Sequence, residues 1–115
     1  MSKFIEVSKI DELKDGTMKM VRIAGREILL ARVGDKYYAT DSRCPHMKGD
    51  LSQGKLEGTV VTCPRHGSQF DISNGRVVRW FKGGLMSKVG KALKMSKGLT
   101  VYTVKLEDGR VLVEV

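Results

Sequence analysis

The sequence contains few residues of the types that cross-link chains or bind metals: its 115 residues include only two cysteines and two histidines. Two cysteines are too few for the disulfide framework of a small secreted domain. A long apolar run is also missing, and the N-terminal stretch Met-Ser-Lys-Phe-Ile-Glu-Val alternates charged and apolar residues, unlike a secretory signal or a membrane span. These absences favour a cytoplasmic protein.

The remaining composition is that of an ordinary globular protein. Hydrophobic residues make up 41% of the chain and charged residues 30%, which excludes a disordered or membrane-embedded chain. The length matches one typical domain. We therefore expect residues 1–115 to form a single domain.

The positive charge is concentrated in one third of the chain. The formal net charge is +8, yet between Asp71 and Glu107 there are eight basic residues and no acidic one, so basic and acidic residues balance elsewhere. Such clustering predicts a basic surface for an acidic partner.

The cysteines and histidines occur together in two short stretches, Cys44-Pro45-His46 and Cys63-Pro64-Arg65-His66, separated by sixteen residues. Two thiolates and two imidazoles can complete either a tetrahedral zinc site or a diiron cluster, so the ligand types alone do not decide. The Cys-x-His spacing is tighter than the usual pairings of zinc fingers. The spacing therefore favours the cluster, with zinc as the alternative.

Short apolar-rich segments between turn residues predict an all-β protein. Ser8 is expected to cap a brief helical turn over residues 10–13. Strands are expected at residues 4–7, 17–23, 27–33, 36–40, 59–62, 68–70, 100–106 and 110–115, the last two as a hairpin. The glycine-rich stretch from 41 to 81 has little core of its own, which is typical of a segment organised by a metal.

Residues 82–97 predict a basic amphipathic helix, because apolar side chains and lysines alternate with a helical period. Such a helix could cover one side of a barrel with its lysines in solvent, or dock to an acidic protein. A membrane surface or nucleic acid is less favoured, and the absence of interleaved aromatic residues argues against nucleic acid.

The ligand pattern resembles that of the Rieske family, in which Cys-x-His is followed by Cys-x-x-His-Gly. The likeness continues over residues 70–75, Val77-Val78 and Trp80, which look like the strand and turn after the second ligand loop of Rieske ferredoxins. This resemblance implies an all-β Rieske fold. It would consist of a small antiparallel barrel or sandwich base from residues 1–40 and 82–115, an inserted cluster-binding subdomain at 41–81, and one short helix near 83–96.

The resemblance also implies the ligands of a Rieske-type [2Fe–2S] cluster, with Cys44 and Cys63 on the inner iron and His46 and His66 on the outer one. High-potential Rieske proteins add a disulfide between the ligand loops, a serine that donates to a cluster sulfur and a tyrosine that donates to a cysteine sulfur. Ser68 stands at the serine position, whereas Phe70 stands at the tyrosine position and lacks the hydroxyl. Fewer hydrogen bonds imply a potential in the lower Rieske range.

These expectations describe an electron carrier and not an enzyme, since no histidine is left for a catalytic mononuclear iron. The first hypothesis is a ferredoxin that takes an electron from a reductase and delivers it to an oxygenase or another acceptor, with an acidic docking surface on its partner. Alternatives are a small subunit of a larger oxidoreductase complex and a zinc-stabilised binding module. No small-molecule substrate is expected.

Overall fold

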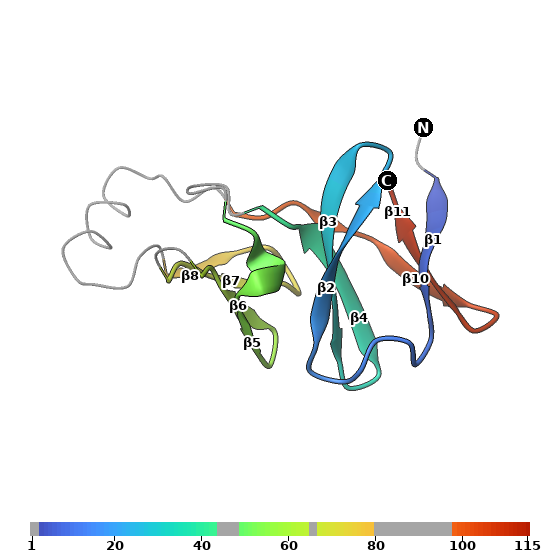
Figure 1. Ribbon diagram of the computed structural model, residues 1–115, viewed down its shortest axis with the longest axis horizontal. Coiled ribbons are helices and arrows are strands. Elements are labelled where there is room, and N and C mark those ends of the chain that lie inside the picture. Colours follow the sequence, from blue (N-terminus) through green and yellow to red (C-terminus); the bar gives the residue numbers. More distant parts are fainter. Residues whose placement is uncertain (1–2, 44–48, 65–66, 80–97) are drawn as a thin grey trace.

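The computed structural model describes residues 3–43, 49–64, 67–79 and 98–115 (Figure 1). The described residues form eleven strands in three antiparallel sheets and one 3-10 turn, η1 (Leu51–Gln53). The all-β prediction is thus confirmed, while the helix predicted near 83–96 lies outside the described residues. Among the described residues, no helix has the length and apolar character needed to cross a membrane.

Two of the sheets form the base of the molecule. The first has the order β1-β11-β10, with β1 (Phe4–Lys9), β11 (Arg110–Glu114) and β10 (Val104–Glu107). The second has the order β2-β3-β4-β9, with β2 (Met18–Ile23), β3 (Arg26–Val33), β4 (Lys36–Asp41) and β9 (Val101–Tyr102). Residues 10–13 form turns, so the predicted helical turn is wrong; β1 extends through Ser8 to Lys9 in pairing with β11.

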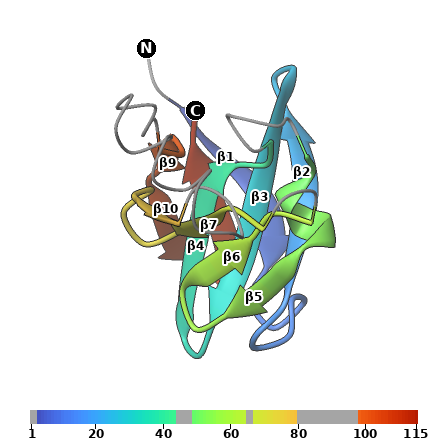
Figure 2. The ribbon, with the colours of Figure 1, turned by 90° about the vertical axis from the view of Figure 1, so that its left-hand side faces the viewer.

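The third sheet is built from the glycine-rich stretch. Its order is β5-β6-β7-β8, with β5 (Lys55–Glu57), β6 (Val60–Thr62), β7 (Gln69–Asp71) and β8 (Val77–Arg79). It packs across the face of the second sheet, in front of β3 and β4 in Figure 2. The second sheet is therefore the middle layer of three.

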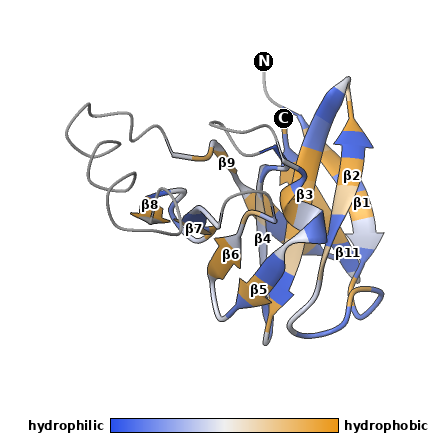
Figure 3. Cartoon of the chain, turned by 60° about the vertical axis from the view of Figure 1, so that its left-hand side comes forward, coloured by the Kyte–Doolittle hydropathy of each residue, from blue (hydrophilic) through white to orange (hydrophobic). Residues whose placement is uncertain are grey.

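The middle position of β3 explains the uninterrupted apolar run from Ile28 to Ala31 at its centre. Ile28 and Leu30 share core clusters with buried valines of β11, whereas Leu29 and Ala31 share a cluster with buried residues of β6 and β7. Successive side chains of a strand point to opposite faces, so the part of a strand that is covered by layers on both sides is apolar at every position. The apolar colouring of β3 is visible in Figure 3.

A close backbone contact joins the third sheet to the base. The N–H of Leu99 donates to the carbonyl of Gly75 at 2.8 Å. A Cβ atom at Gly98 would overlap that same carbonyl oxygen, and one at Gly75 would overlap the Leu99 carbonyl. Gly75 also has a φ of +78°, a conformation that side-chain-bearing residues rarely adopt. The turn between β7 and β8 and the segment just before β9 therefore touch through two positions that require glycine.

Candidate metal centre

The two predicted ligand loops begin and end at tightly paired backbone positions. Arg43 and Asp50 form an antiparallel bridge that closes the first loop, and the N–H of Leu51 donates to the Ser42 carbonyl at 2.8 Å. The second loop lies between β6 and β7, where the N–H of Cys63 donates to the Ser68 carbonyl at 2.7 Å. Both loops are short and closed at their stems.

The stems of the two loops pack against each other. Leu51, just after the first loop, and Cys63, at the start of the second, belong to one buried cluster. A Cβ atom at Gly54 would overlap the Thr62 carbonyl oxygen, so the segment after η1 runs directly against the end of β6. The fold thus brings together two loops that are far apart in the sequence.

Cys63 is the one predicted ligand among the described residues. It is 1% exposed and has no disulfide. Cys44, His46 and His66 lie outside the described residues, so the complete ligand set stays a prediction. A buried thiol at the mouth of a closed loop suits a metal ligand, because surrounding apolar groups exclude competing water.

Ser68 carries the best test of whether a cluster fits. Its side chain is 0% exposed, and its Oγ has no hydrogen-bond partner among the described residues. A buried hydroxyl without a partner costs about 1–3 kcal/mol, so native proteins rarely keep one. An acceptor bound between the loops, such as a sulfide of an iron–sulfur cluster, would satisfy it. The residues present therefore fit the predicted group.

Phe70 cannot supply the hydrogen bond that a tyrosine at its position would donate to a cysteine sulfur. It is 0% exposed and lies in the same core cluster as Cys63 and Val61. Its ring contributes apolar burial worth about 2–3 kcal/mol, but it has no hydroxyl to donate. The position predicted to tune the potential is thus apolar here.

Carboxylates near the loop stems are held ionised. Hydrogen bonds from Arg43 and then Arg22 lower the pKa of Glu27 from 4.5 to about 2. Burial raises the pKa of Asp50, but hydrogen bonds from Ser52 and from Ser42 outweigh this and lower it. Neither Glu27 nor Arg43 stands out in the sequence, because the two residues are sixteen positions apart and no spacing pattern connects them.

The fold and these closed loops define a small all-β protein whose two loops can hold a metal cluster. The family model of the Rieske [2Fe–2S] domain matches residues 3–84. The chain therefore belongs to the Rieske [2Fe–2S] family, as its ligand pattern suggested: it carries a Rieske-type [2Fe–2S] cluster and acts as a one-electron carrier, not as a catalyst itself.

Similar proteins include ferredoxin components. The ferredoxin component of naphthalene 1,2-dioxygenase/salicylate 5-hydroxylase systems from Ralstonia sp is 30% identical over 111 residues, which is 96% of this chain and 94% of that protein. A chain in the complex of reduced oxygenase and oxidised ferredoxin in carbazole 1,9a-dioxygenase is 29% identical, with a TM-score of 0.78 and coverage of 96% of this chain and 91% of that one. The carbazole 1,9a-dioxygenase ferredoxin from Nocardioides aromaticivorans IC177 shares the fold at 24% identity, with a TM-score of 0.79 and 96% of both chains covered.

Proposed function

We propose that this chain is a cytoplasmic ferredoxin that passes single electrons from a reductase to a terminal oxygenase. The observation that carries the proposal is the buried Cys63 thiol together with the buried Ser68 hydroxyl, which has no hydrogen-bond partner among the residues that the structure describes, at the packed stems of two closed loops. Relatives that match nearly the whole chain are ferredoxin components of dioxygenase systems, which supports the oxygenase as acceptor.

In this proposal, Cys44 and Cys63 bind the inner iron, and His46 and His66 bind the outer iron. When bound, the cluster accepts and releases one electron, and its neutral imidazole ligands make reduction easier than four thiolates would. The loop stems hold the ligands in place, and apolar packing around Cys63 excludes water. We assign the base to residues 1–40 and 82–115 and the cluster-binding subdomain to residues 41–81.

The partner is proposed to present an acidic docking surface. Lys48 and Arg65 are each within two residues of a proposed histidine ligand, and the acid-free stretch between Asp71 and Glu107 adds eight basic residues. Clustered positive charge accelerates encounter with a negative surface, and dissolved salt weakens that attraction.

Anaerobically prepared protein tests the cofactor assignment. We expect a brown protein with iron and acid-labile sulfide in equal amounts, and a Rieske-type paramagnetic resonance signal after reduction with dithionite. A colourless protein that holds zinc and stays folded would refute the proposal. Constant co-purification with a catalytic subunit would instead identify a permanent subunit of a larger complex.

Electron delivery tests the partner assignment. With a reductase and a Rieske oxygenase present, the rate of oxygenase reduction should fall as salt increases. Replacing Lys91 and Lys94 by Glu should slow it further, while the same change at Lys9 and Lys14, on β1 and the turn after it, serves as the charge-matched control. Equal effects of the two double substitutions would contradict the proposed docking surface.

A further inference from the structure

Glu27, near the start of β3, contacts the stem of the first ligand loop in two ways. Its carbonyl accepts a hydrogen bond from the N–H of Ser42 at 3.1 Å. Its carboxylate accepts two from the Arg43 guanidinium, Nε to Oε1 at 2.8 Å and Nη2 to Oε2 at 3.2 Å. Ser42 and Arg43 directly precede Cys44, so one contact holds the backbone and the other holds a side chain just before a proposed ligand.

The ion pair between Glu27 and Arg43 is bidentate, which is the strong geometry for a contact between a guanidinium and a carboxylate. Two parallel hydrogen bonds between a guanidinium and a carboxylate fix orientation as well as distance. Arg22, the cross-strand partner of Glu27 on β2, donates from Nη2 to Oε2 at 2.9 Å. The Glu27 side chain is 24% exposed, less than either arginine, so it lies between two cations and stays ionised.

The other side of the stem is held by Asp50. Its Oδ1 accepts hydrogen bonds from the Ser42 hydroxyl at 3.0 Å, and from the N–H and hydroxyl of Ser52 at 3.0 and 2.6 Å. Asp50 therefore fixes the returning end of the loop through neutral hydroxyl and amide donors. The bidentate contact to the arginine before Cys44 comes from Glu27.

We propose that Glu27 is a positioning residue for electron transfer: through Arg43 it fixes the stem of the first ligand loop, and its fixed negative charge offsets Arg43 beside the cluster and so lowers the reduction potential. This inference rests on the proposed function, because it requires Cys44 to be a ligand. Consecutive Cα atoms are about 3.8 Å apart, so the backbone that carries Arg43 leads directly into the proposed ligand that follows it.

The direction in which the reduction potential of the Glu27→Gln variant should change follows from charge alone. Reduction adds a negative charge to the cluster, so an adjacent carboxylate opposes it and an unbalanced guanidinium favours it. Glu27→Gln keeps the shape of the side chain and removes the carboxylate charge that faces the Arg43 guanidinium. The potential should therefore rise, and the loop stem should hold the ligands less firmly.

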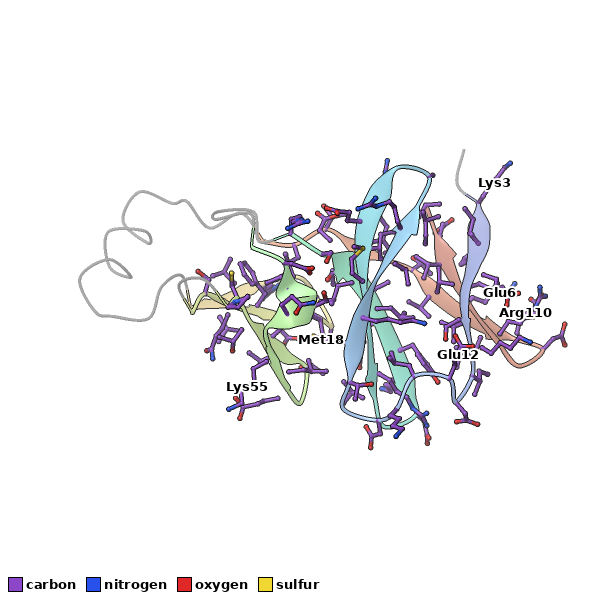
Figure 4. All side chains as sticks on the ribbon, viewed as in Figure 1. Lys3, Glu6, Glu12, Met18, Lys55 and Arg110 are labelled. Atoms are coloured by element: carbon purple, nitrogen blue, oxygen red, sulfur yellow. The ribbon has the colours of Figure 1, made fainter. Side chains whose placement is uncertain are left out.

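The control is an equivalent ion pair at the other end of the molecule. Glu107 contacts Lys105 at 2.9 Å and Arg110 at 3.8 Å, and a hydrogen bond from Lys105 lowers its pKa as Arg43 lowers that of Glu27. The β10–β11 hairpin is opposite the β5–β8 sheet in Figure 1, and Arg110 is labelled at that end in Figure 4. Glu107→Gln thus removes the same charge far from the cluster.

The experiment measures the potential of the cluster-loaded protein and the half-life of the cluster in an iron chelator. Glu27→Gln should raise the equilibrium constant for one-electron reduction about threefold, or about 28 mV, and shorten the half-life about threefold. Glu107→Gln should change neither. Arg43→Gln should lower the potential and also shorten the half-life, which provides a second test should Glu27→Gln fail to fold.

The outcomes separate this inference from the proposed function. Wild-type protein that holds a reducible cluster, with Glu27→Gln and Glu107→Gln at the same potential, would refute the role of Glu27 and leave the proposed function intact. A fall in melting temperature without a change in potential would also refute it, since a merely structural ion pair behaves in that way. Wild-type protein without a cluster would overturn both.

Discussion

Replacing Ser68 by Ala should lower the reduction potential of the cluster. The Ser68 side chain is 0% exposed and its Oγ has no partner among the described residues, so its hydroxyl can donate to a sulfur of the bound cluster. The backbone of Ser68 is held independently, because its carbonyl accepts from the Cys63 N–H at 2.7 Å. The substitution therefore removes one donor without displacing the loop.

The size of the shift follows from the strength of that hydrogen bond. A hydrogen bond to a charged acceptor contributes about 1.5–3 kcal/mol, and roughly 1 kcal/mol of this is expected to differ between the reduced and oxidised cluster. For one electron, that difference corresponds to a potential about 40 mV lower. The sign is set by the reduced cluster, which is more negative and accepts the hydrogen bond more strongly.

A redox titration followed by paramagnetic resonance measures this potential directly. Ser73→Ala is the matched control, because Ser73 lies in the turn after β7 and its hydroxyl donates to Asp71 at 2.6 Å. That control should leave the potential unchanged. An unchanged potential in Ser68→Ala would remove Ser68 from the proposed role, and a higher potential would refute the hydrogen-bond reasoning itself.

Three further perturbations have defined outcomes. Replacing His46 or His66 by Ala should abolish or radically alter the paramagnetic resonance signal, and an unchanged signal would show that the ligand assignment is wrong. Gly98→Ala should lower the melting temperature, because the new Cβ overlaps the Gly75 carbonyl and forces a backbone shift costing about 1–3 kcal/mol; an unchanged melting temperature would contradict the close contact. The pKa of Glu27 falls from 4.5 to about 2 on folding, so its stabilising contribution is present above pH 4.5 and disappears as the pH falls toward 2. In urea unfolding, wild-type protein should therefore lose more stability over that interval than Glu27→Gln, and equal losses would count against the ion pair.

Most strands could be predicted because their signals are local. The turn glycines and the alternation of apolar residues located β2, β3, β4 and β11 within a residue or two. β5 was missed, because Lys55–Glu57 is too short and polar to stand out. Its pairing with β6 comes from the turn between them and from the sheet behind it.

The predicted strand over residues 100–106 shows what the local sequence pattern cannot predict. The structure divides it at Thr103 into β9, which pairs with β4, and β10, which pairs with β11. The alternation in the sequence is the same for one long strand or two short ones. Only the positions of the two partner sheets decide that the chain changes sheets there.

The sequence by itself determined the chemistry: two thiols and two imidazoles in a spacing that defines the Rieske family, on a chain of short β-strands. Only the tertiary structure decided that the Ser68 hydroxyl is buried with no hydrogen-bond partner in the described part of the chain, and that Glu27 binds Arg43 before the first ligand loop. Ligand spacing is a property of neighbouring residues and can be read along the chain. Burial and ion pairing join residues that are distant in the sequence, so they exist only once the sheets have packed together.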